Sequence, residues 1–186
     1  DVRVSRSSLS FGNVATGGET ETSLTVHNCT GAELVLKADP VVSKGKSHGV
    51  RVEGADQDIT GRHKDGAYKW LLKPHSATVV DVKMSASSKP GLLEGELRMY
   101  LSPTDRMTVP FSGEVFRPEV EVLFRGEPVP ARDAVSAGSV QTGTPFTFRC
   151  RVLNSGRVPC HVHGLVRNPS RGFAALEVRG AEIAPE

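Results

Sequence analysis

The sequence predicts an all-β chain that folds as antiparallel β-sandwich modules, two of them in tandem. Apolar and polar residues alternate with the period of a β-strand along most of the 186 residues. Clusters of Gly, Pro, Ser and Asp break these stretches at intervals of roughly eight to twelve residues, which is typical of two-sheet β proteins. No segment has the period of an amphipathic helix, and one phrase of the sequence occurs twice.

The repeated phrase is the most informative feature of the chain. It reads FGNVATGGETETSLTVHN at residues 11–28 and AGSVQTGTPFTFRCRVLN at residues 137–154, an offset of 126 without a gap. Chance gives about one identity over such a length. Six identities are present, and they include the pairs Gly12/Gly138, Val14/Val140 and Asn28/Asn154. We therefore expect a duplicated unit, with one module at residues 1–116 and a second at residues 117–186.

Local chemistry predicts how the phrase folds. Phe11 should face the core, and Gly12 should take part in a turn or bulge directly after it. Asn28 can hydrogen-bond to its own backbone where the strand has to turn, and Asn154 occupies the same place in the second copy. Asn28 also begins a formal glycosylation sequon, but the second copy lacks its threonine, so a turn residue explains both asparagines better.

Further strands of the first module are expected at residues 22–28, 33–38, 48–54, 67–72, 77–86, 94–102 and 106–115. Trp70 should lie in the core. The ADP cluster at residues 38–40 and the proline at position 74 should each end a strand. The second copy stops at Glu186 before an equivalent set of strands, so we expect an incomplete module. The chain would then be a fragment, or a partner would supply the missing strands.

Composition narrows the classes of function. The net charge of +2 gives no general attraction to nucleic acid, and no apolar run is long enough to insert into a membrane. The three cysteines are too few for a disulfide-built secreted module, which favours a cytoplasmic protein. Cys150 and Cys160 flank a turn, and they either stay reduced or pair with each other.

Three stretches carry a family resemblance. They are LSFGNVATGGETETSLTVHNCTGAELVLK at residues 9–37, WLLKPHSATVVDVKMSASSKPGLLEGELRMYLS at residues 70–102 and VPFSGEV at residues 109–115. Together they resemble an ASH (ASPM–SPD-2–Hydin) domain, an immunoglobulin-like relative of the major sperm protein domain in the PapD-like superfamily. The resemblance implies a non-enzymatic protein scaffold at centrosomes, cilia or flagella, without a cofactor. Its partners would be other proteins, such as acidic peptide segments or tubulin-associated components.

One binding mode of the wider family is not expected here. Major sperm protein domains bind acidic-tract peptides through a basic face that includes a Lys-Thr-Thr stretch. The comparable strand end in this chain reads KADP, from Lys37 to Pro40, and lacks both threonines.

A basic segment offers a second candidate surface. The stretches SKGKSHG and GRHKDG read as loops, and loops at one end of a sandwich can converge on a partner. The alternative is a solvated face that only keeps the protein soluble. Tyr68 and Trp70 are the few aromatic residues nearby, which argues against nucleic-acid binding. The candidate partner-binding residues are Lys44, Lys46, His48, Arg62, His63 and Lys64.

Catalytic and metal-binding patterns are weak. His161 and His163 lie two apart on an expected strand and could supply two metal ligands, but no third ligand is nominated by the spacing. No nucleophile elbow occurs, so the sequence predicts no enzyme. The alternative to a cytoskeletal scaffold is a bacterial or cell-surface immunoglobulin-like adhesion or chaperone module, which an oxidised pair of Cys150 and Cys160 would favour.

Overall fold

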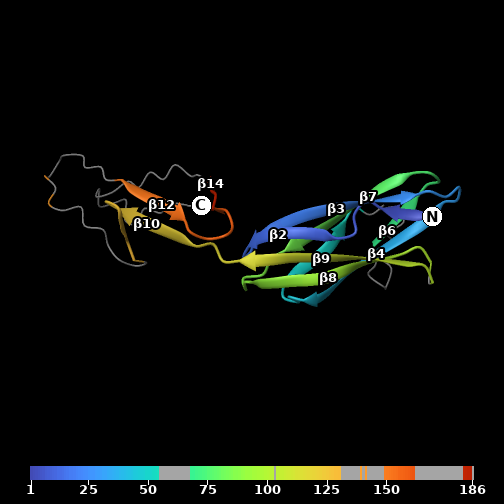
Figure 1. Ribbon diagram of the computed structural model, residues 1–186, viewed down its shortest axis with the longest axis horizontal. Coiled ribbons are helices and arrows are strands. Elements are labelled where there is room, and N and C mark those ends of the chain that lie inside the picture. Colours follow the sequence, from blue (N-terminus) through green and yellow to red (C-terminus); the bar gives the residue numbers. More distant parts are fainter. Residues whose placement is uncertain are drawn as a thin grey trace. The chain divides into compact units, whose positions relative to one another are not determined.

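A computed structural model describes residues 1–54, 68–102, 104–130, 139, 141, 149–161 and 182–185 (Figure 1). The chain divides into two units, Asp1–Phe116 and Arg117–Glu186. Every element in the described part of the chain is a β-strand.

The first unit consists of two sheets. The four-stranded sheet has the order β1-β3-β7-β5, with strands Val2–Val4, Glu19–Asn28, Ala77–Ser85 and Gly49–Glu53. The five-stranded sheet has the order β2-β9-β8-β4-β6, with strands Leu9–Ala15, Arg106–Phe116, Gly91–Tyr100, Leu34–Lys44 and Tyr68–Leu72.

The distribution of strands between the sheets identifies the topology. If β1, β3, β4, β5, β7, β8 and β9 are lettered A to G, one sheet carries A, B, E and D and the other carries C, F and G. This division defines the two sheets of an immunoglobulin constant-type sandwich. The fold is immunoglobulin-like. The two extra strands, β2 and β6, occupy the two edges of the five-stranded sheet.

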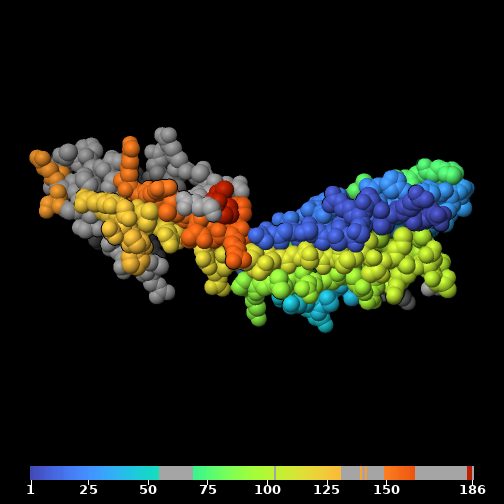
Figure 2. All heavy atoms as spheres, viewed as in Figure 1, coloured from blue at the N-terminus to red at the C-terminus, as the bar shows by residue number. Residues whose placement is uncertain are grey.

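One strand pair departs from the expected antiparallel arrangement. The N-terminal segment pairs with β3 through β1, then crosses to the other sheet, where β2 runs parallel to β9. In Figure 2 the blue N-terminal strands lie directly against the yellow-green strand β9. The second strand of this unit therefore pairs with its last strand at one edge of the five-stranded sheet, and no hairpin constrains their relative direction.

The core lies between the two sheets and follows the predicted alternation. Leu24 and Val26 point inward from β3, with 1% and 0% of their surface exposed. Trp70 is 1% exposed, as the sequence predicted, and its indole Nε1 donates a hydrogen bond of 2.8 Å to the backbone oxygen of Gly54. A buried Trp with a satisfied N–H contributes apolar area without the cost of an unpaired donor.

The opening of the repeated phrase forms the predicted bulge. The pairing of β2 with β9 shifts register between Ser10 and Asn13, and Gly12 has φ of 64°. Glycine adopts this left-handed conformation without the steric penalty of a Cβ. Phe11 then points inward, where its ring meets Phe111 edge to face at 5.9 Å between centroids.

The largest error among the predicted strand boundaries is at the end of β4. The ADP cluster does not end a strand, because β4 continues through it to Lys44. Strand β6 pairs with β4 only as far as Ala38, so Pro40 has β8 as its strand neighbour on one side. A proline at such a half-edge position is tolerated because one side of the strand needs no ladder hydrogen bond there.

The second unit is described in part. Its strands are β10 (Val120–Phe124), β11 (Glu127–Pro128), β12 (Cys150–Asn154), β13 (Cys160–His161) and β14 (Glu182–Ile183). They form a three-stranded sheet of order β11-β10-β12 and a β13-β14 pair. The repeat residues Gly138 and Val140 lie outside the described residues. All three cysteines are free thiols, so Cys150 and Cys160 are not joined.

The two units share the asparagine corner. Asn28 ends β3 and Asn154 ends β12, and each is 1% exposed. In both, the side-chain oxygen accepts a hydrogen bond of 3.0 Å from the backbone N–H two residues later. In both, the side-chain nitrogen donates to the backbone oxygen four residues later, at 2.8 Å and 2.9 Å. The asparagines are therefore turn residues, as predicted.

Candidate interaction surfaces

The basic turn at Lys44–His48 is one of the two surfaces predicted from loops. It begins at the end of β4, where Gly45 has φ of 76°. A Cβ at this position would also collide with the backbone of β8, so both the conformation and the space require glycine. The turn closes with a backbone hydrogen bond of 2.9 Å from the N–H of His48 to the oxygen of Gly45.

The basic residues of this turn differ in their exposure to solvent. Lys46 is exposed, and Lys44 is also exposed beside Glu94 at 3.8 Å, an ion pair that contributes little in solvent. His48 is only 5% exposed, and its Nδ1 accepts a hydrogen bond of 3.1 Å from the backbone N–H of Ser87. His48 is thus a structural residue that joins two loops, whereas the sequence suggested a surface role.

The structural role of His48 gives a testable expectation. The His48→Ala substitution should lower the free energy of unfolding by about 2 kcal/mol, because it leaves a cavity and removes the partner of a half-buried N–H. Denaturant unfolding followed by Trp70 fluorescence measures this. Lys46→Ala is the matched control in the same turn and should stay within about 0.5 kcal/mol of the unaltered protein. Equal effects of the two substitutions would contradict the role given to His48.

The other basic loop lies outside the described residues. Arg62, His63 and Lys64 fall there, so the convergence of the two loops stays a prediction. Of the candidate metal ligands, His161 is exposed on β13 and His163 is outside the described part of the chain. Among the described residues no three His, Cys, Asp or Glu side chains gather in a group that could hold a metal ion. The described part also contains no helix long and apolar enough to cross a membrane.

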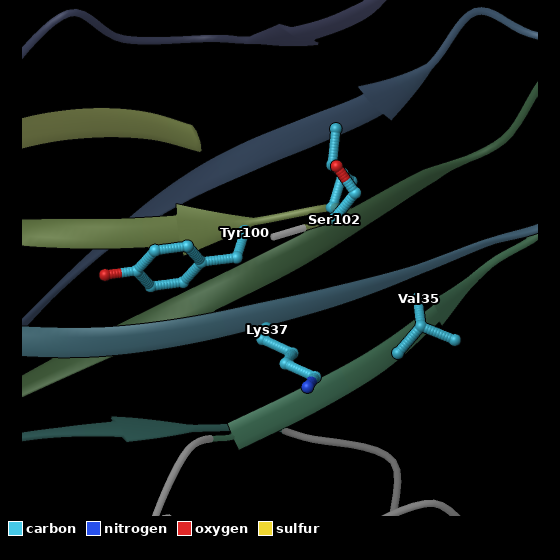
Figure 3. Close-up of a pocket in the computed structure, with 5 residues that line it drawn as sticks. Val35, Lys37, Tyr100 and Ser102 are labelled. Atoms are coloured by element: carbon cyan, nitrogen blue, oxygen red, sulfur yellow. The ribbon is translucent and has the colours of Figure 1, made fainter. Parts of the chain in front are cut away.

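A pocket on the outer face of the five-stranded sheet is a surface that the sequence analysis missed (Figure 3). It has a volume of about 290 Å³ and is lined by residues of the neighbouring strands β4 and β8 and of the turn after β8. Val35 is 40% exposed, and the ring of Tyr100 is half-buried. Its lining residues are Val35, Lys37, Tyr100, Leu101 and Ser102.

The apolar part of this pocket has a signal in the sequence. Strand β4 begins Leu-Val-Leu, so three consecutive apolar residues interrupt the alternation. Leu36 points into the core at 0% exposure, which forces its neighbour Val35 to the outer face. Strand β4 therefore presents an apolar residue to the outer face as well as to the core.

Strand pairing determines which charged residues lie beside the pocket. Lys37 lies directly opposite Tyr100 on β8 and opposite Lys69 on β6. Two residues before Tyr100, the Arg98 guanidinium donates to the Glu96 carboxylate at 2.6 Å. This hydrogen bond raises the pKa of Arg98, with smaller contributions from the charge of Glu96 and from Tyr100. The outer face thus carries Asp39 and Glu96 beside Arg98, next to a pocket lined by Lys37.

On the opposite sheet the outer face is covered by ion pairs. Lys83 lies 2.9 Å from Glu19, and Arg51 lies 3.8 Å from the same carboxylate. Hydrogen bonding from Lys83 and Ser85 lowers the pKa of Glu19. Charges that satisfy one another are typical of a solvated face.

Comparison with known proteins yields structural matches. No family model matches the chain, and no curated protein matches its sequence. The ASH/PapD-like domain 7 of human CEP192 aligns at 14% identity with a TM-score of 0.45, over 63% of this chain and 87% of that domain. SSP-19, an MSP-domain protein of Caenorhabditis elegans, aligns at 10% identity with a TM-score of 0.35, over 59% and 96%.

The Escherichia coli chaperone DraB aligns at 10% identity with a TM-score of 0.37, over 63% of this chain and 55% of the chaperone. The structural matches thus include ASH, major sperm protein and PapD-like domains, the classes that the sequence resembles. They concern the fold. The function has to be argued from this chain's own surfaces.

Proposed function

We propose that the chain is a non-enzymatic scaffold that binds other proteins in a centrosomal, ciliary or flagellar assembly of the cytoskeleton. The observation that carries the proposal is the outer-face pocket of the five-stranded sheet, where Val35 stands exposed beside Tyr100 and Lys37. Exposed apolar and aromatic side chains framed by polar ones are the usual composition of a protein-binding surface. Among the described residues that line the pocket, none has a carboxylate or imidazole that could act as a general base.

The charge of the pocket indicates the chemistry of its partner. Lys37 lines the pocket, and the exposed Asp39, two residues later on β4, lies on the same face opposite Arg98. A partner segment with both acidic and apolar side chains would complement this surface. Acidic segments of tubulin-associated components have this chemistry.

The cellular setting and the tandem arrangement rest on the sequence. The resemblance of residues 9–115 to ASH domains supports a cytoskeletal location. The ungapped repeat and the asparagine corner found in both units support two ASH-like modules in series.

A matched pair of substitutions tests the pocket. Val35 and Val79 are both exposed, at 40% and 49%, but they lie on the outer faces of opposite sheets. We expect Val35→Asp to weaken partner binding about tenfold or more, because it places a carboxylate in an apolar contact. Val79→Asp should leave binding unchanged. The measurement is the centrosomal, basal-body or axonemal enrichment of each tagged variant in its native cell.

Folding of both variants is checked by Trp70 emission before their location is compared. Equal enrichment of the two variants would show that the pocket is not the partner-binding surface. Secretion of the unaltered protein, or a cell-surface signal, would contradict the scaffold function as a whole.

A further inference from the structure

A serine that lines the outer-face pocket is followed by proline in the sequence. Ser102 lies in the turn between β8 and β9, and it lines the pocket together with Lys37 of β4 (Figure 3). Of the twelve prolines of the chain, Pro103 and Pro145 are the two that follow a serine or threonine. Protein kinases that select proline after the acceptor residue do so because proline has no backbone N–H to leave unpaired in an apolar site.

The turn presents the hydroxyl group of Ser102 at the surface. Ser102 is exposed, and the turn closes with a backbone hydrogen bond of 3.1 Å from the N–H of Leu101 to the oxygen of Asp105. An exposed turn between two strands is the kind of segment that a modifying enzyme reaches. The acceptor is thus accessible in the folded protein.

The local hydrogen bonds are compatible with a phosphoryl group at this position. The Ser102 Oγ accepts hydrogen bonds from the backbone N–H groups of Thr104 and Asp105, at 3.3 Å and 3.0 Å. A phosphoserine carries three strong acceptor oxygens on the same side chain. These oxygens can take over the two N–H groups, so phosphorylation does not require the turn to leave its donors unpaired.

Strand pairing places cationic residues beside this turn. Tyr100, two residues before Ser102, lies opposite Lys37 on β4 and opposite Arg106 on β9. A phosphoserine brings a charge of about −1.5 to −2 at neutral pH. Because Lys37 and Ser102 line the same pocket, the added charge would attract the ammonium group of Lys37 into an ion pair.

We propose that Ser102 is the acceptor of a proline-directed protein kinase and that its phosphorylation releases the partner from the outer-face pocket. The Ser102 Oγ attacks the γ-phosphorus of the Mg-ATP that the kinase holds, and the bond from this phosphorus to ADP breaks. The hydroxyl proton passes to the catalytic aspartate of the kinase. The products are a phosphate monoester on Ser102 and ADP.

Release follows from the charge of the partner and rests on the proposed function, whereas the assignment of the acceptor does not. The proposed partner segment carries acidic and apolar side chains. A phosphoryl group in the pocket would repel the acidic side chains and engage Lys37. It would also have to lose water when apolar groups of the partner pack against it, which costs free energy.

The acceptor is tested by incubating the full chain with a cyclin-dependent kinase and Mg-ATP and locating the phosphate by tandem mass spectrometry. Each protein carries Thr144→Ala, which removes the other hydroxyl group that precedes a proline. We expect phosphate on Ser102, and Pro103→Ala should slow its transfer about tenfold or more while it keeps the hydroxyl group. The matched control, Thr104→Ala in the same turn, should be phosphorylated on Ser102 at an unchanged rate.

The place of the phosphoryl group is tested by ³¹P NMR of the phosphorylated protein. We expect the pKa of phosphoserine 102 to lie below its value in a phosphorylated peptide of residues 98–106, because Lys37 favours the dianion. The peptide retains Arg98, Asp105 and Arg106, so the difference reports residues of other strands. Lys37→Gln should raise this pKa toward the peptide value, and Lys46→Gln, in the turn after β4, should leave it unchanged.

The release is tested by the cytoskeletal enrichment of tagged variants in the native cell. Ser102→Glu, which supplies part of the phosphate charge, should lower enrichment several-fold. Thr104→Glu places the same charge in the same turn on a residue that does not line the pocket, and it should stay enriched. Trp70 emission shows that both variants are folded.

Different results would overturn different parts of the proposal. Phosphate on other residues but not on Ser102, or equal rates with and without Pro103, would remove the acceptor assignment. An unchanged phosphoserine pKa in Lys37→Gln would show that the phosphoryl group lies outside the pocket. Full enrichment of Ser102→Glu while Val35→Asp is lost would contradict release but leave the scaffold function standing. Full enrichment of both variants would contradict the pocket as the partner-binding surface.

Discussion

Asn28→Ala should lower the free energy of unfolding of the first unit by about 3 kcal/mol or more. The side-chain nitrogen donates to the backbone oxygens of Ala32, Leu72 and Lys73, at 2.8 Å, 3.2 Å and 3.0 Å. Alanine would remove this donor from a site where the asparagine is 1% exposed. The bond to Leu72 is buried and the other two are partly buried, and a buried unmet group costs about 1–3 kcal/mol. The measurement is denaturant unfolding followed by the fluorescence of Trp70, the one tryptophan of the chain.

Two controls make this result specific. Asn13→Ala removes an exposed asparagine from the same unit and should change the unfolding free energy by less than about 0.5 kcal/mol. Asn28→Asp keeps the shape but turns a carboxylate toward carbonyl oxygens, so we expect it to be at least as destabilising at neutral pH. A small effect at Asn28, similar to that at Asn13, would show that the corner does not stabilise the sandwich.

Gly95→Ala should be the other large effect, again about 3 kcal/mol in unfolding free energy. Gly95 lies in β8 opposite Phe111, and a Cβ at this position would collide with the Phe111 ring and with the backbone oxygen of Val41. Overpacking of this kind costs about 1–3 kcal/mol, and the upper end applies because the backbone of a central strand cannot retreat. Urea unfolding with Trp70 as the probe gives the value.

The cause of this effect is separable by a second substitution. Phe111→Leu replaces the ring that the new methyl group would meet by a smaller side chain. Gly95→Ala should therefore cost less unfolding free energy in that background than in the unaltered protein. Gly31→Ala is the matched control, because its Cβ would meet no atom closer than 4.0 Å. If Gly95→Ala were as mild as Gly31→Ala, the close approach of the strands would not be what requires glycine.

Local chemistry in the sequence was enough for several features. The alternation of apolar and polar residues predicted that Leu24 and Val26 face the core. The requirement for a turn after Phe11 predicted the bulge at Gly12. The asparagine corner was predictable because Asn28 bonds to backbone only two and four residues away. Such features depend on a few neighbouring residues, so they can be predicted without the rest of the chain.

The candidate surfaces were less predictable. The basic turn was identified from its lysines, but the burial of His48 depends on Ser87, thirty-nine positions later in the chain. The outer-face pocket requires β4 and β8 to be neighbours. Residue types alone do not reveal which strands pair.

By itself the sequence determined the strand period, the two-sheet class, the bulge and the repeated corner, because these follow from interactions within a short stretch of chain. Only the tertiary structure decided that β2 runs parallel to β9, that β4 continues through Pro40 and that Val35 and Tyr100 share a pocket. Those outcomes are set by pairing between segments far apart in sequence. The free energy of such pairing depends on packing across the whole sandwich, which no local pattern encodes.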